Sequence, residues 1–267
     1  MNAALNTTTP LLLICFHHAG GGTANYYRWR RALPASVELL PVALPGHDGR
    51  LNETLFSDLR KLTSWLTDEL REKIHERPFV LLGHSMGAWL AFELARELRR
   101  RRRPAPKLLI AAASRPPDTL IAGSRLHLMP DDELVASVDQ LYNGIPPALR
   151  NHPELLKLML PAIRADLQLI ETYEYAEEPP LDVDVLALGG SDDPAVTIDQ
   201  LNGWRRHTAS NFAVRLFPGG HFFLFLKNSP VEPAGIRLPT QETPALRAIL
   251  TRLQLLLDES QSESTIS

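Results

Sequence analysis

The stretch FVLLGHSMGA, residues 79–88, decides the fold of this chain. Four apolar residues, typical of a buried strand, are followed by Gly-His-Ser-Met-Gly, which fits the Gly-x-Ser-x-Gly pattern of a nucleophile elbow. Such an elbow places the serine on a sharp turn between a strand and a helix, where glycines avoid the collisions of Cβ atoms. Residues 86–100 then have the apolar spacing of a helix. We therefore expect Ser85 to project its hydroxyl above a sheet.

Short apolar runs recur along the chain and alternate with amphipathic, helical patterns. The predicted strands are residues 11–16, 37–44, 79–82, 108–113, 183–188 and 212–217. This alternation predicts an α/β fold with a mostly parallel central sheet flanked by helices. In such sheets ligands bind outside the carboxyl ends of the strands, and the polar motifs of this chain follow directly after these runs.

The chain is long enough for one α/β domain, and we expect a single domain over residues 1–267. The interval of about 115–180 contains no convincing strand but two helical patterns, and the second has more apolar residues than one core-facing stripe needs. The extra apolar surface is expected if this interval is a lid insertion that covers the active face. The alternative is an ordinary helical layer packed on the sheet. Residues 259–267 are expected to form a flexible tail after a C-terminal helix.

Composition excludes several classes of protein. A net charge of −3 argues against a general nucleic-acid-binding function. The single cysteine, Cys15, excludes an internal disulfide, and its apolar surroundings indicate a buried packing thiol. The first residues lack the basic start of a signal peptide, and no apolar segment has the length of a membrane span. We expect a cytoplasmic monomer that binds neither nucleic acid nor membranes.

A serine hydroxyl needs a base, and the base needs a third group that orients it. In the elbow fold these groups follow in the order serine, acid, histidine. His221 comes after the last predicted strand and is the expected base, whereas His207 lies in a helical pattern and is expected on the surface. The acid should follow the strand at 183–188, where both Asp192 and Asp193 are available. The spacing along the chain does not decide which of the two is the acid.

The developing oxyanion needs backbone N–H donors. Met86, next to the serine, is one candidate, and the loop HHAGGG after the first strand offers His18 or Ala19 as the other. The pair His17 and His18 suggests a metal at first sight, but no further ligands stand at a recognisable spacing. The triple glycine lacks the partners of a phosphate-binding loop. We expect neither metal nor cofactor.

Together, these motifs resemble the type II thioesterases of polyketide and nonribosomal peptide synthesis, which belong to the α/β-hydrolase superfamily. The resemblance covers nearly the whole chain and rests on CFHHAGGG (15–22), LPGHDGR (44–50), FVLLGHSMGA (79–88), YNGIPP (142–147), LMLPAIRADLQLIETYEY (158–175), ALGGSDDPAV (187–196) and FPGGHFFL (217–224). The chain departs from the family pattern at His17, where proline is usual, and at Met159, where leucine is usual.

The resemblance implies a function and a set of site residues. Such enzymes hydrolyse acyl groups held as thioesters on the phosphopantetheine arm of a carrier protein, and they remove stalled or wrong acyl units. The implied catalytic residues are Ser85, His221 and, matching the second Asp of the family segment, Asp193. A mobile helical lid in the interval 115–180 is implied as well.

Two other functions remain open. A general carboxylesterase or lipase acting on oxygen esters would need the same three residues. A catalytically idle domain that only binds carrier proteins would have no reason to retain all of them. The arginine run at 99–103 suits docking of an acidic carrier protein, but we favour a solvated helix end.

Overall fold

The computed structural model describes residues 9–119, 125–142, 144–145, 151–225 and 242–266. All strand pairings in its six-stranded sheet are parallel, and the strand order is β2-β1-β3-β4-β5-β6. The strands are β1 (Leu11–Phe16), β2 (Val37–Pro41), β3 (Phe79–His84), β4 (Leu108–Ala112), β5 (Asp184–Gly190) and β6 (Phe212–Phe217). The chain runs from β1 to β2 on one side and then crosses to β3 on the other. Ligand sites of open α/β sheets form where the strand order reverses in this way.

The predicted strands are confirmed, with small differences at their ends. β2 ends at Pro41 instead of residue 44, while β3 continues past residue 82 to His84. β3 continues because Gly83 and His84 still pair with neighbouring strands. Every residue of β1, β3 and β4 is buried, as the continuous apolar runs predict for strands covered on both faces.

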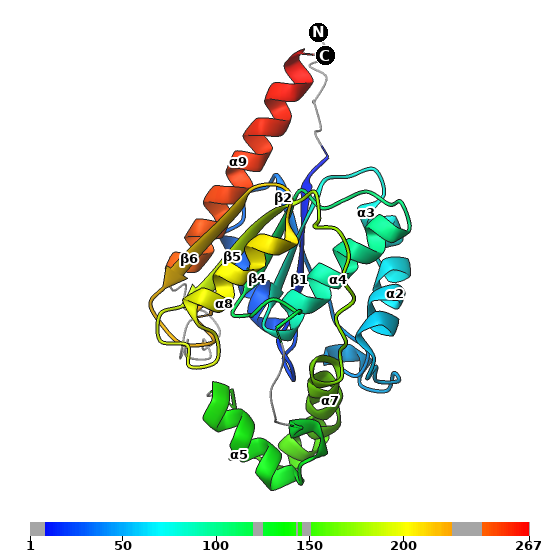
Figure 1. The fold of residues 1–267 in the computed structure, drawn as a ribbon, viewed down its shortest axis with the longest axis vertical. Helices are drawn as coiled ribbons and strands as arrows, with labels where there is room; N and C mark the ends of the chain where they lie inside the picture. Colours follow the sequence, from blue (N-terminus) through cyan, green and yellow to red (C-terminus); the bar gives the residue numbers. More distant parts are fainter. Residues whose placement is uncertain (1–8, 120–124, 143, 146–150, 226–241, 267) are drawn as a thin grey trace, which may run out of the picture.

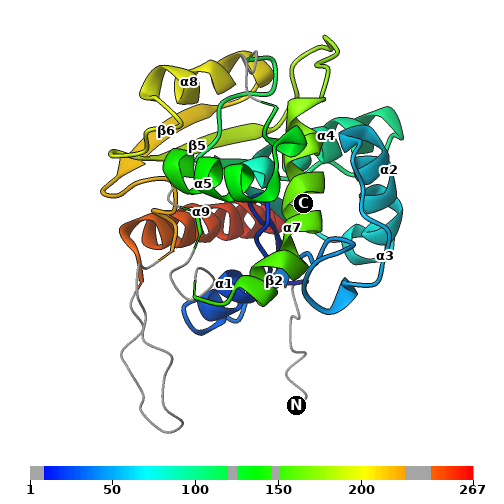
Figure 2. The same ribbon diagram turned by 90° about the horizontal axis from the view of Figure 1, so that it is seen from below.

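Helices cover both faces of the sheet (Figures 1 and 2). One face carries α2 (Leu59–Glu69), α3 (Arg71–Ile74), α4 (Met86–Arg100), α8 (Ile198–Asn202) and the 3₁₀ helix η4 (Gly203–His207). The other carries α1 (Ala24–Tyr27), η1 (Arg28–Arg31) and α9 (Pro244–Ile266). Each face has its own core cluster, and Cys15 is buried in the second.

In the described part of the interval between β4 and β5, both predicted helical patterns form helices. It contains η3 (Leu126–Leu128), α5 (Asp131–Tyr142) and α7 (Pro153–Glu171), and the short η2 (Asp48–Arg50) lies in the loop after β2. α5 and α7 lie at the lower end of the molecule in Figure 1, beyond the carboxyl ends of the strands. They share a small apolar cluster with η3, made of Leu126, Leu134, Leu160, Ile163 and Leu167.

The C-terminal helix is longer than expected. α9 continues to Ile266, into the segment for which the sequence predicts a flexible tail. The segment contains no glycine or proline that would end the helix. Among the described residues, no helix is both long and apolar enough to cross a membrane.

Candidate active site

Ser85 sits on the turn between β3 and α4 with a backbone φ of 56° and ψ of −117°. This left-handed conformation is rare for residues other than glycine, and it is stabilised by a hydrogen bond from the Ser85 N–H to Ala112 O at 2.8 Å. A Cβ on Gly83 would lie 2.0 Å from Gly87 O, and a Cβ on Gly87 would lie 2.3 Å from Phe16 O. Both glycines are therefore required for the close approach that the elbow pattern predicts.

His221 and Asp193 meet in the loops after β5 and β6. His221 Nδ1 lies 2.9 Å from Asp193 Oδ2, and the two side chains are 3% and 0% exposed. The other carboxylate oxygen, Oδ1, accepts a hydrogen bond from Ala195 N–H. Asp192 is exposed, and its backbone N–H donates to Gly219 O. Of the two aspartates that the sequence left open, Asp193 is the one that contacts the imidazole.

His84, the residue before Ser85, lies behind this pair. Its Nε2 is 2.7 Å from the backbone oxygen of His221, and its Nδ1 is 3.3 Å from Nδ1 of His18. Burial, with a smaller contribution from the charge of His221, lowers the pKa of His84 to about 3. A neutral His84 thus supports the His221 backbone without adding a competing positive charge beside the ring.

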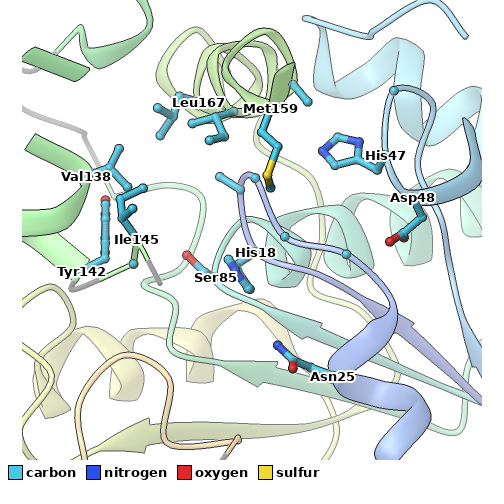
Figure 3. A pocket seen from close by; sticks show the side chains of 18 of the residues that line it. His18, Asn25, His47, Asp48, Ser85, Val138, Tyr142, Ile145, Met159 and Leu167 are labelled. Atoms are coloured by element: carbon cyan, nitrogen blue, oxygen red, sulfur yellow. The ribbon is translucent and has the colours of Figure 1, made fainter. Parts of the chain in front are cut away.

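Ser85 and His221 line a cavity of about 330 Å³. Figure 3 shows Ser85 and His18 on one side of it, facing side chains of α5 and α7 that include Val138, Tyr142, Met159 and Leu167. A second cavity of about 40 Å³ on the α4 side is lined by Ser85 and His221 as well. The serine hydroxyl therefore lies between a larger, mostly apolar space and a smaller one.

The two predicted donor segments both border this region. Met86 is the first residue of α4, so its N–H has no acceptor within the helix. In the loop after β1, Gly20 N–H donates to Asp166 Oδ2 at 2.8 Å and Gly21 N–H donates to His18 O at 2.9 Å. The N–H groups of Gly20 and Gly21 therefore already have acceptors within the protein. His18 and Ala19, the two alternative donors predicted from the sequence, precede them in the same loop.

The structure gathers a side-chain cluster that sequence spacing did not reveal. One donor atom from each of His17, His47 and Asp166 lies within 4.8 Å of the others, and all three residues are buried. His47 Nε2 and Asp166 Oδ2 are 2.9 Å apart, which is a direct hydrogen-bond distance. Two ligands of one tetrahedral zinc would be separated by roughly 3.4 Å, given zinc–ligand distances of about 2.1 Å. The observed spacing therefore fits a hydrogen-bonded pair better than two ligands of one metal.

The structure places His207 differently from the sequence prediction, and it brings Tyr142, for which the sequence predicted no role, to the site. His207 is 4% exposed and pairs through Nε2 with Asp118 at 3.0 Å, so its prediction as a surface residue is wrong. A helical pattern alone does not tell which face meets the sheet. Tyr142, from the YNGIPP motif, packs against His221 with ring centroids 4.8 Å apart. The end of α5 thus covers the imidazole.

This arrangement contains the parts needed for acyl transfer. A hydroxyl projects from a strained turn, and a buried carboxylate orients a nearby imidazole. The glycine-rich loop borders the larger cavity, Met86 at the N-terminus of α4 borders the smaller one, and Ser85 lines both. No cofactor is needed for such chemistry.

Comparisons with known proteins agree with this geometry. The family model of the thioesterase domain matches residues 12–232. The gramicidin S biosynthesis protein GrsT of Aneurinibacillus migulanus is 34% identical over 225 residues, which are 84% of this chain and 87% of that protein.

Two solved structures extend the likeness to the fold. The RedJ thioesterase of the prodiginine pathway in Streptomyces coelicolor has a TM-score of 0.78 and 30% identity, covering 95% of each chain. YbtT, a type II thioesterase of the yersiniabactin pathway, has a TM-score of 0.71 and 32% identity over 83% of this chain and 89% of its own. The predicted α/β-hydrolase fold is confirmed. This chain belongs to the thioesterase family of hydrolases, among the type II thioesterases of nonribosomal peptide and polyketide pathways.

Proposed function

We propose that this protein hydrolyses acyl thioesters carried on the phosphopantetheine arm of carrier proteins, with Ser85 as nucleophile, His221 as base and Asp193 as the orienting acid. The observation that carries the proposal is the buried contact of Asp193 with His221 Nδ1 beside Ser85 in one cavity. With Nδ1 paired to the carboxylate, the free Nε2 of His221 is the atom that accepts a proton.

The reaction proceeds in two steps. Ser85 Oγ attacks the thioester carbonyl as its proton passes to His221 Nε2, and collapse of the tetrahedral intermediate expels the thiol, which takes that proton. Water then attacks the acyl-serine with the same histidine as base, releasing the carboxylic acid and restoring the hydroxyl. Backbone N–H groups of Met86 and of His18 or Ala19 stabilise the oxyanion in both steps, each contributing roughly 3 kcal/mol.

The helices of the interval 115–180 act as a lid in this proposal. They share a small core of their own, while Leu169 of α7 lies in the cluster on the α4 face of the sheet, so α7 joins the lid to the sheet. Leu155 and Leu158 on α7 are 46% and 61% exposed, and Leu158 borders the large cavity. We infer that the apolar cavity takes the acyl chain and that a carrier protein approaches over this rim.

The decisive experiment compares matched substrates. The same acyl group is presented as a thioester on carrier-bound phosphopantetheine and as an oxygen ester, with wild-type protein, Ser85→Ala and His221→Ala. We expect hydrolysis of the thioester by the wild type and a loss of at least 10³-fold in both variants, by analogy with other serine hydrolases. Preferred hydrolysis of the oxygen ester would favour a general esterase. Retained activity in Ser85→Ala would exclude the proposed nucleophile.

A further inference from the structure

The loop after β1 is held at its centre by a residue of α7. Gly20 adopts a φ of +69°, and its N–H donates to Asp166 Oδ2 at 2.8 Å. On the same face of α7, one turn earlier, Ile163 lies so close that a Cβ on Gly20 would be 2.5 Å from its Cγ1. One apolar and one charged side chain of α7 therefore fix the backbone at Gly20.

Asp166 is held in turn by His47. Asp166 is 2% exposed, and its Oδ2 also accepts from His47 Nε2 at 2.9 Å. His47 Nδ1 faces Pro45 O at 3.2 Å, so a ring with protons on both nitrogens satisfies both acceptors. Burial lowers the pKa of His47, but the hydrogen bond and negative charge of Asp166 outweigh burial and raise it overall. Both side chains are buried, so this hydrogen bond is shielded from water.

We propose that Asp166 is a positioning residue: by holding Gly20 N–H, it sets the backbone of the preceding residues, His18 and Ala19, as oxyanion donors. The inference rests on the proposed function, since it assigns a purpose to the loop within that reaction. Because Asp166 belongs to α7, the oxyanion site is complete only while this part of the lid is docked. Asp166 is the last residue of the RAD segment, residues 164–166, within the motif LMLPAIRADLQLIETYEY.

The other end of the loop does not depend on α7. Thr23 N–H donates to Asp48 Oδ2 at 3.0 Å, and Asp48 comes from the loop after β2. The link through Asp166 joins the lid to the oxyanion loop by a charged hydrogen bond, and such bonds are about twice as strong as neutral ones. Loss of Asp166 should release the Gly20 side of the loop and leave the Thr23 side in place.

The test uses Asp166→Leu, Asp166→Asn and a matched control, Asp118→Leu. Asp118 pairs with the buried His207 but lines neither cavity. We expect Asp166→Leu to lower kcat by about 10- to 100-fold with KM changed by less than about 2-fold, because displacing an oxyanion donor affects the transition state and not substrate binding. Asp166→Asn keeps an oxygen acceptor for Gly20 N–H and should retain most of kcat. Asp118→Leu should lower stability without lowering kcat at a temperature where it is folded.

A second readout is independent of activity. Amide hydrogen exchange of residues 17–22 should accelerate in Asp166→Leu and stay unchanged in Asp118→Leu. If Ser85→Ala disproved the proposed function, this measurement would still report on the loop. Unchanged kcat and exchange in Asp166→Leu would overturn the proposal, as would equal damage by Asn and Leu. Stoichiometric zinc in the purified protein, whose removal abolishes activity, would also overturn it and make the cluster a metal site.

Discussion

At the scale of single residues, Ser85 combines backbone strain with exposure to the cavity. A non-glycine residue in this conformation costs on the order of 1–3 kcal/mol, and it persists because the surrounding contacts hold it. At Ser85 those contacts are the bond to Ala112 O and the glycine-mediated packing of β3 against α4. The strained turn lowers the stability of the protein, but it points the hydroxyl away from the core and toward the cavity.

The two neighbouring aspartates allow a direct test of the site. Asp193→Asn should lower kcat by roughly 10²- to 10⁴-fold, because an amide cannot hold the imidazole in the tautomer that accepts a proton at Nε2. Asp192→Asn should change kcat by less than about 3-fold, since Asp192 is exposed and contributes only its backbone N–H to this region. Steady-state hydrolysis of one acyl thioester measures both. The opposite order would assign the acid to Asp192.

Buried histidines make the stability of the protein depend on pH. The pKa of His84 is about 3 in the folded state and about 6.5 in an unfolded chain, so between these values only the unfolded state binds the proton. The contribution of His84 to the stability therefore falls by about 2 kcal/mol between pH 7 and pH 5. His17 and His18, whose pKa values are also lowered by burial, act in the same direction, whereas the raised pKa of His47 acts in the opposite direction.

Replacing His84 by Gln should reduce this pH dependence. We expect the free energy of unfolding of His84→Gln, measured by urea denaturation, to change by about 2 kcal/mol less than that of the wild type between pH 7 and pH 5. Because each protein is compared with itself at the two pH values, the effect of the substitution on stability at a single pH cancels. Equal pH dependence in both proteins would show that folding does not shift the pKa of His84.

At the scale of elements, α7 connects the lid to the rest of the molecule. Arg164 donates to His127 O at 2.6 Å and Met129 O at 2.8 Å, and it pairs with Asp131 Oδ1 at 2.6 Å. These bonds hold the start of α5 on α7, while Asp166 holds the loop after β1. The two charged residues of the RAD segment thus serve two different neighbours.

Arg164→Met should loosen α5, because two backbone oxygens and one carboxylate lose their donor. We expect the free energy of unfolding to fall by about 1–2 kcal/mol and KM to rise several-fold, since Val138 and Tyr142 of α5 line the cavity. Lys157→Met is the matched control on the same helix, because the pair of Lys157 with Glu154 is exposed. Denaturation and substrate titration measure the two effects. A KM equal to that of the wild type would show that the position of α5 does not affect substrate binding.

At the scale of the whole molecule, the arginine run lies far from the site. α4 starts next to Ser85 and has 15 residues, so its other end is roughly 22 Å away. There Arg99 pairs with Glu178, Arg100 with Glu97, and Arg101 with Asp68. These internal pairs favour the interpretation as a helix end over a docking surface.

Carrier recognition can be measured against this expectation. We expect kcat/KM to be at least about 10-fold higher for an acyl group on carrier-bound phosphopantetheine than on coenzyme A, because the carrier offers a larger contact surface. The double substitution Arg102→Glu and Arg103→Glu should leave that ratio unchanged at low and moderate salt. A fall in the ratio would place the docking surface at this end of α4. Equal efficiencies for both substrates would show that the enzyme does not recognise carriers.

Local patterns in the sequence determined the elements and much of the candidate site. Apolar runs, the elbow glycines and the histidine after the last strand depend on neighbouring residues, so Ser85 and His221 could be predicted from their segments. Strand ends were less accurate, because pairing extends β3 beyond its apolar run.

Only the tertiary structure decided contacts between distant segments. It showed that Asp193, which the spacing left undecided and the family resemblance favoured, contacts His221. It also buried His207 against Asp118 and brought Asp166 of α7 to Gly20 and His47. The physical reason is that a buried polar group needs a partner, while chain spacing does not reveal which distant loop supplies it. That choice follows from the packing of the sheet, its helices and the segment that covers them.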